Sequence, residues 1–140
     1  MKIAIACDHT GPELKNYIIQ KLGDKYEFIN CGTDTEESID YPDYSKKATD
    51  LILNKEVDCA VLICGTGIGM SIAANKVRGI RAGLCHNPVE ARLTKEHNNA
   101  NVICLGARMI GKDLAVENVK AYLEATFQGG RHQNRINKLE

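Results

Sequence analysis

Short and almost continuous apolar segments alternate along the chain with longer segments in which apolar side chains recur every three or four positions. The first kind is typical of strands buried on both faces of a parallel sheet, and it occurs at residues 2–7, 26–31, 59–64, 80–85 and 101–106. The second kind predicts amphipathic helices at residues 11–22, 42–53, 69–76, 88–95 and 112–127. Strands that alternate with helices in this way predict an α/β protein, a three-layer α/β/α sandwich around a five-stranded, parallel, Rossmann-like sheet.

The chain is predicted to form one domain over residues 1–140, because this length suits a single core and no shift in composition divides it. Residues 128–140 form a polar and basic tail, and Gly129 and Gly130 are expected to end the preceding helix. Arg131 and Arg135 lie one helical turn apart in this tail, so both guanidinium groups can point the same way and bind a phosphate. A solvated basic tail is the simpler interpretation, and these residues alone favour it.

Charge and composition bear on the possible partners. The net charge is zero, so charge gives no general argument for binding nucleic acid or an acidic membrane surface. No apolar run approaches the ~20 residues that span a bilayer, and the short apolar N-terminus lacks the features of a signal peptide. The six cysteines form no C-x-x-C pair, which argues against a zinc or thioredoxin-like site and suits a reducing, cytoplasmic compartment.

Ligands of open parallel sheets bind beyond the carboxyl ends of the strands, and four predicted strands end in reactive or charged side chains. These strand ends read Cys7-Asp8-His9, Cys64-Gly65-Thr66-Gly67, Cys85-His86 and Gly106-Ala107-Arg108. Asp8 and His9 follow a strongly apolar strand, where a buried charge is costly without a partner or a task. His97 and Asn98 lie in the link before the last strand, so the rule does not place them. A lone histidine is more often a surface residue than a catalyst.

Three glycines at alternate positions, Gly65, Gly67 and Gly69, follow the most apolar strand. This spacing lets the backbone turn sharply and point several N–H groups at one spot, and the following helix adds its positive end. The loop is therefore expected to hold an anion, either a phosphate or an oxyanion formed during a reaction. A tight turn without a ligand is the alternative. A Walker loop does not fit, because no Gly-Lys-Ser/Thr follows, and the dinucleotide spacing G-x-G-x-x-G is not met.

Cys64 directly precedes these glycines. A thiol with the ordinary pKa of about 8.5 is a poor base at neutral pH, but a glycine loop and a helix N-terminus beside it would stabilise the thiolate. Thr66 offers a hydroxyl that could orient the thiol or relay its proton. The alternative is an inert cysteine in a buried strand, like Cys59 or Cys104, and these residues alone slightly favour it.

Seven segments, taken together and in order, resemble the cysteine-type ribose-5-phosphate isomerases of the ribose/galactose isomerase family. They are CDHTG at 7–11, DYPDY at 40–44, ICGTGIGMSIAANK at 63–76, GIRAGLC at 79–85, EHNNANV at 96–102, LGAR at 105–108 and GGRHQNR at 129–135. The resemblance covers almost the whole chain. It implies interconversion of D-ribose 5-phosphate and D-ribulose 5-phosphate without a metal or cofactor, and a sheet with strand order 2-1-3-5-4.

The resemblance also implies catalytic roles. Cys64 matches the base that takes the C2 proton and returns it to C1, and Thr66 matches a hydroxyl that assists it. The amides from Gly65 to Gly69 match the donors that stabilise the enediolate oxygen. Asp8 and His97 match residues tied to opening the furanose ring.

The resemblance implies substrate-binding roles for a second set of residues. The phosphate contacts are His9, Arg131, Arg135 and Arg108. The sugar-hydroxyl contacts are Tyr41 and Asn98. In the family the site is shared between two subunits, so His97, Asn98 and the arginines would face the partner's Cys64. The tail would then pack on that partner in a homodimer, and the resemblance leaves open whether dimers pair into a tetramer.

Met70 favours the cysteine-type branch, because another branch of the family carries a glutamate base at that position and a methionine cannot abstract a proton. Galactose-6-phosphate isomerase subunits lack a cysteine at the position of Cys64. Three alternatives stay open: a six-carbon substrate such as allose 6-phosphate, a phosphate-binding module without catalysis, and a redox-sensing Cys64.

Overall fold

A computed structural model describes all 140 residues. Its five strands form one parallel sheet in the order β2-β1-β3-β5-β4, which confirms the expected order. The strands are β1 (Lys2–Cys7), β2 (Glu27–Asn30), β3 (Cys59–Cys64), β4 (Ala82–Leu84) and β5 (Val102–Gly106). The strand β4, at the sheet edge, is shorter than its apolar segment predicts.

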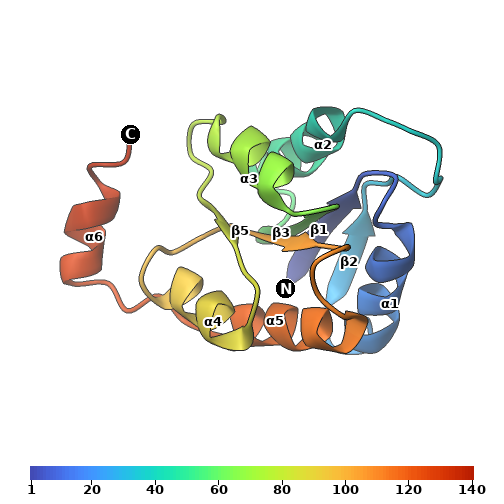
Figure 1. The fold of residues 1–140 in the computed structure, drawn as a ribbon. Helices are drawn as coiled ribbons and strands as arrows, with labels where there is room; N and C mark the ends of the chain where they lie inside the picture. The colour runs from blue at the N-terminus through green and yellow to red at the C-terminus, as the bar shows by residue number, and fades with distance from the viewer.

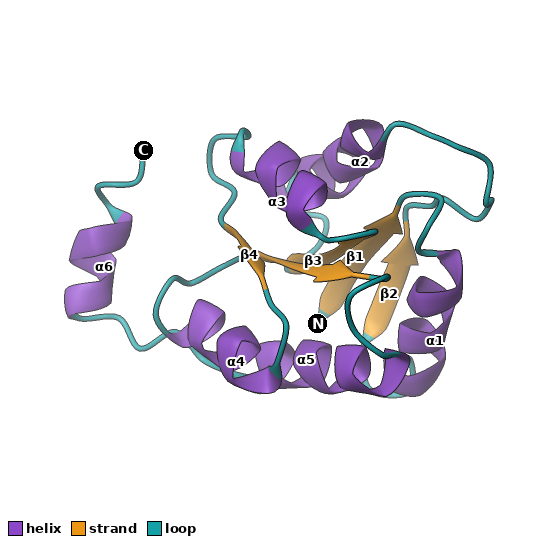
Figure 2. Ribbon diagram, in the orientation of Figure 1, coloured by secondary structure: helices purple, strands orange, loops and turns teal.

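The chain forms six helices: α1 (Pro12–Leu22), α2 (Tyr41–Leu53), α3 (Ile68–Asn75), α4 (Pro88–Glu96), α5 (Lys112–Glu124) and α6 (Arg131–Ile136). Figure 1 shows α1, α4 and α5 on one face of the sheet and α2 and α3 on the other. The C-terminal helix α6 stands apart at the end of an extended link, which Figure 2 draws as loop. No helix of the structure combines the length and apolarity that crossing a bilayer requires.

The end of α5 differs from the prediction. The apolar period continues to Phe127, but Ala125 has extended backbone angles and the helix ends at Glu124. Gly129 and Gly130 then adopt positive φ values of 68° and 57°, which reorient the chain before α6 begins at Arg131. The expected helix break is therefore real, and the tail beyond it forms a short helix.

Each face of the sheet carries its own apolar core. Alternate residues of β1 and β3 point to opposite faces, so that Ile3, Ile5, Val61 and Ile63 lie in the core beneath α1, α4 and α5. The other core, beneath α2 and α3, includes the side chains of Cys64, Ala4, Ala6, Ala48, Ala60, Leu62, Met70, Ala74, Val102 and Cys104. Burial on both faces explains why the strands read as continuous apolar runs.

The strand register places the carboxyl ends of β1, β3 and β5 side by side. Cys7 pairs with Ile63, and Cys64 pairs with Gly106. Beyond these pairs the backbone amide of Asp8 donates to the carbonyl of Ile63 over 3.0 Å, and that of Ala107 donates to the carbonyl of Cys64 over 2.8 Å. The segments that follow β1, β3 and β5 are therefore side by side.

Lys15 anchors the link between β2 and α2 to these strand ends. Its side chain is fully buried. Its ammonium donates to the carbonyl of Thr33 over 2.7 Å, to the amide oxygen of Asn30 over 2.9 Å and to the carboxylate of Asp34. Thr33 is in turn joined to β1, because its amide donates to the carbonyl of Cys7 over 2.9 Å. One buried cation thus satisfies an acceptor at the end of β2 and two in the link.

Replacing Lys15 by methionine is expected to lower the free energy of unfolding by about 1–3 kcal/mol, because the buried Thr33 carbonyl loses its charged donor. Urea denaturation at neutral pH measures this change. The matched control is Asp34→Asn, which removes the exposed partner of the pair and is expected to cost less than about 1 kcal/mol. Equal losses in the two variants would contradict this account.

The same pair predicts how stability depends on pH. The hydrogen bonds from Lys15 and Asn30 lower the pKa of the Asp34 carboxyl. A lowered folded-state pKa stabilises the protein above the unfolded value, about 4 for Asp, and this contribution is lost as pH falls through the folded value. The stability difference between wild type and Asp34→Asn is therefore expected to shrink below about pH 4. A difference that stays constant down to pH 2 would contradict it.

Candidate active site

Cys64 lies at the carboxyl end of β3, where its side chain is 5% exposed. The backbone amide of Gly67 donates a hydrogen bond to its sulfur over 3.2 Å. Gly67 is the N-cap of α3, so the sulfur also lies at the positive end of that helix. Both features place backbone N–H groups and the positive end of a helix beside the sulfur.

The neighbouring cysteines differ in this respect. Burial raises the pKa of the Cys7 and Cys59 thiols to about 11 and that of Cys85 to about 12, so these thiols stay protonated at neutral pH. The amide donor at the start of α3 is what separates Cys64 from a structural cysteine. This contact favours a specialised thiol over an inert strand cysteine at position 64.

The loop after β3 forms the sharp turn that its glycines predict. Gly67 has φ 80°, in the left-handed region, and a Cβ there would lie 2.9 Å from the carbonyl carbon of Leu105. The exposed Thr66 hydroxyl accepts from the amide of Ile68 over 3.1 Å, which caps the first turn of α3. The next amides, those of Gly69 and Met70, donate to no acceptor within the chain. The amides of Gly65 and Thr66 likewise have no acceptor within the chain, so the loop offers several donors to an anion beside Cys64.

Residues from other elements surround this loop. The side chain of Arg108 lies over Gly65, and the Tyr41 ring, at the first position of α2, lies against Gly69. The amide of Arg108 donates to the carbonyl of Gly65 over 2.9 Å, which fixes the end of β5 on the loop. Arg108 therefore belongs to the same edge as its own chain's Cys64. It is not one of the groups that a partner would have to supply.

Asp8 and His9 lie next to Cys64 on the neighbouring strand end. Asp8 is 7% exposed, and its carboxylate accepts from the amide of Thr10 over 2.9 Å and from the hydroxyl of Thr10 over 2.6 Å. The Nδ1 atom of His9 accepts from the amide of Ile39 over 3.5 Å, at the long limit for a hydrogen bond. This contact leaves the Nε2 atom available to a ligand.

His97 and Asn98 lie near the amino-terminal ends of the strands, opposite to the carboxyl ends where Cys64 lies. They follow α4 directly, and the carbonyl of Asn101 accepts from the amide of Ala60, four residues before Cys64. At about 3.3 Å per residue, the link before β5 is ~13 Å from the carboxyl edge along the strand direction. One chain thus does not bring His97 and Asn98 to its own Cys64.

Arg131 and Arg135 belong with His97. Both are exposed on α6, and between them His132 stacks on the His97 ring at 4.4 Å between ring centres and 11° between ring planes. Burial, with His97 and the two arginines nearby, lowers the pKa of His132 and favours its neutral form. His132 had no predicted role, although its place between the two arginines in the sequence was a visible signal. The predicted residues therefore form two groups at opposite edges of the sheet.

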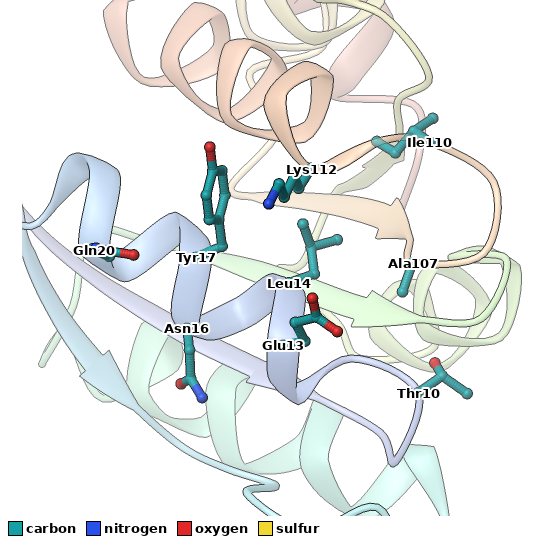
Figure 3. A pocket seen from close by; sticks show the side chains of 9 residues that line it. All are labelled: Thr10, Glu13, Leu14, Asn16, Tyr17, Gln20, Ala107, Ile110 and Lys112. Carbon is teal, nitrogen blue, oxygen red and sulfur yellow. The ribbon is translucent and has the colours of Figure 1, made fainter.

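A cavity of about 520 Å³ between α1 and the start of α5 contains none of the predicted catalytic residues. Figure 3 shows its lining, which is Thr10, Glu13, Leu14, Asn16, Tyr17, Gln20, Ala107, Ile110 and Lys112. The Tyr17 hydroxyl is already bonded to Asp113, and the Lys112 ammonium lies 4.8 Å from the centre of the Tyr17 ring. No cluster of His, Cys, Asp or Glu side chains has an arrangement that could hold a metal ion.

The chain is similar to proteins of one family along its whole length. A sequence model of the family described as Ribose/Galactose Isomerase matches residues 3–139. A putative sugar phosphate isomerase of Bacillus subtilis is 48% identical, with 99% of this chain and 95% of the relative covered. Ribose-5-phosphate isomerase B of Escherichia coli is 45% identical, with 99% and 93% covered.

Solved structures with similar sequences also share the fold of this chain. The ribose 5-phosphate isomerase of Thermotoga maritima superposes with a TM-score of 0.96 at 52% identity, covering 99% of this chain and 96% of that one. Ribose-5-phosphate isomerase B of Mycoplasma genitalium, solved with bound ribulose-5-phosphate, gives a TM-score of 0.93 at 40% identity, covering 99% and 93%.

Proposed function

The chain belongs to the ribose/galactose isomerase family, and we propose that it interconverts D-ribose 5-phosphate and D-ribulose 5-phosphate with Cys64 as the base. The observation that carries the assignment of the base is the 3.2 Å hydrogen bond from the Gly67 amide to the Cys64 sulfur. Met70 is fully buried in the core beneath α3, so it offers no competing group.

The reaction is a proton transfer between two neighbouring carbons. In the open-chain aldose the Cys64 thiolate takes the proton from C2, and the C2–H electron pair becomes the C1–C2 double bond of an enediolate. The negative charge moves to the oxygen on C1, where the free amides of the loop from Gly65 to Gly69 stabilise it. The thiol then returns the proton to C1. The proton on the C2 oxygen moves to the C1 oxygen, relayed by the Thr66 hydroxyl, which leaves a ketone at C2 and a hydroxyl at C1. One well-placed oxyanion donor contributes about 3–4 kcal/mol.

Ring opening precedes this step, because ribose 5-phosphate is mainly a closed furanose. We assign it to Asp8 and His97, one from each group of site residues. His9, through its Nε2 atom, and the guanidinium groups of Arg131, Arg135 and Arg108 bind the phosphate. This remote binding energy fixes the reacting carbons against Cys64. Tyr41 and Asn98 bind the sugar hydroxyls.

A homodimer with shared sites reconciles the two groups of residues. His97, Asn98 and α6 of one copy would face the Cys64 edge of the other, and the tail from residue 128 would pack on that copy. The exposed Ile68 and Ile72, at 52% and 55%, offer α3 as an apolar contact surface near the thiol. The six cysteines, all unpaired, suit a reducing cytoplasm, and we infer a role in pentose phosphate metabolism there.

Steady-state kinetics with ribose 5-phosphate test the function directly. We expect kcat/KM to be higher for ribose 5-phosphate than for allose 6-phosphate, and activity to persist after exhaustive chelation. The longer sugar would have to fit between Cys64 and the same phosphate contacts. A higher kcat/KM for allose 6-phosphate would overturn the choice of substrate. Tight binding of both sugars without turnover would indicate a phosphate-binding module.

A further inference from the structure

Arg81, in the link between α3 and β4, holds the backbone of the segment that carries Asn98. Its Nε donates to the carbonyl of Asn98 over 3.0 Å, and its Nη2 donates to the carbonyl of Asn99 over 2.9 Å. Both carbonyls follow the end of α4, where backbone oxygens lack intrahelical donors and the helix dipole favours a cation. A single planar guanidinium satisfies both of them.

The backbone of Arg81 is itself held in place by hydrogen bonds. The Asn101 side chain accepts from the amide of Arg81 over 2.8 Å and donates to the carbonyl of Gly79 over 2.9 Å. The carbonyl of Arg81 accepts from the amides of Asn101 and Val102 over 3.0 and 3.2 Å. The backbone of Arg81 is thus bonded to Asn101 and Val102, and the Arg81 side chain is bonded to Asn98 and Asn99.

Asn98 needs such support because its own side chain is exposed and makes no recorded hydrogen bond within the chain. Asn99 has φ 45°, a left-handed conformation that asparagine adopts more readily than most non-glycine residues. The hydrogen bonds from Arg81, and one from the Lys95 ammonium to the Asn99 side chain over 3.1 Å, hold this turn in place. The direction of the Asn98 side chain is therefore set through its backbone.

We propose that Arg81 is a positioning residue for the isomerase reaction, which orients Asn98 toward the sugar without touching the substrate. The proposal depends on the sugar-binding role proposed above for Asn98. Arg81 also lines a groove of about 460 Å³ together with Asn99 and with Gln133 and Ile136 of α6. It thus lies between the Asn98 segment and the helix that carries Arg131 and Arg135.

Arg81→Gln is expected to lower kcat/KM for ribose 5-phosphate by about 10–100-fold, because displacement of a binding group by about 1 Å can cost that much. Arg81→Lys keeps the charge but cannot bridge both carbonyls with a planar fork, so an intermediate loss is expected. The matched control is Arg78→Gln. Arg78 lines the same groove, is exposed and contacts only the Glu140 carboxylate at 3.6 Å, so kcat/KM is expected to stay within about twofold.

A double-mutant cycle separates positioning from general destabilisation. If Arg81 acts through Asn98, Arg81→Gln lowers kcat/KM at most about threefold in an Asn98→Ala background, because coupled residues are not additive. A full 10–100-fold loss in that background would overturn the proposal, and so would a wild-type-like Arg81→Gln enzyme. Each kinetic value is taken well below the unfolding transition of its variant, so that nearly all chains are folded. An inactive wild type would instead refute the proposed function itself.

Discussion

Replacing Cys64 by alanine is expected to lower kcat for ribose 5-phosphate by about 10²–10⁴-fold, the usual contribution of a positioned general base. The phosphate and hydroxyl contacts lie on other residues, so ribose 5-phosphate is expected to bind with nearly unchanged affinity. Steady-state kinetics and titration calorimetry measure the two quantities separately. Retention of more than a tenth of kcat would remove Cys64 from the mechanism.

Cys59→Ala is the matched control, because Cys59 is a buried cysteine at the other end of β3 with a pKa of about 11. This substitution is expected to cost some stability and to leave kcat unchanged. Peroxide treatment of the wild type tests the redox alternative. Inactivation through a defined, reducible disulfide at Cys64 would support a sensing role.

The Cys64→Ala variant also tests whether the active site is shared between two subunits. Cys64→Ala and His97→Asn subunits, each nearly inactive alone, are unfolded together and refolded as a mixture. If the site uses Cys64 of one copy and His97 of the other, each mixed dimer has one complete site, and the mixture is expected to regain activity. A mixture that stays inactive although the subunits exchange would show that one chain supplies both groups.

Gly67→Ala is expected to disrupt both stability and catalysis. A Cβ at this position would lie 2.5 Å from Leu84 Cδ1 and 3.0 Å from the carbonyl oxygen of Leu105, and the backbone has φ 80°. Left-handed strain costs about 1–2 kcal/mol and overpacking about 1–3 kcal/mol, so a loss of about 2–5 kcal/mol in unfolding free energy is expected. Urea denaturation measures it.

Catalysis is expected to fall because relief of this clash moves the Gly67 amide away from the Cys64 sulfur. Loss of one preorganised donor lowers kcat by about 10²–10³-fold in comparable sites. The control is Gly111→Ala, where φ is −72° and no atom lies within 4 Å of an added Cβ. It is expected to cost less than about 1 kcal/mol and to leave kcat unchanged. Similar effects in both variants would refute this role of the loop.

Segments with a strong local pattern were predicted well. The strands β1 and β3 begin and end where their apolar runs do, and α1 and α2 begin within one residue of the prediction, beside Pro12 and Pro42. The end of α5 was predicted wrongly, because the apolar period continues to Phe127 while the backbone becomes extended at Ala125. A periodic pattern records which side chains face the core, and it does not record where the backbone stops being helical.

The sequence by itself determined the α/β class, the tight turn at Gly67 and the local set of groups around Cys64, because burial on both faces and backbone freedom are encoded over a few neighbouring residues. It did not determine, from pattern alone, which strand lies beside which. The pairing of β1 with β3 places Asp8 beside Cys64, and the direction of β5 places His97 at the opposite edge. The contacts of Arg81 with the Asn98 segment likewise appear only in the folded chain. These arrangements arise from packing between residues far apart in sequence, and so only the tertiary structure decided them.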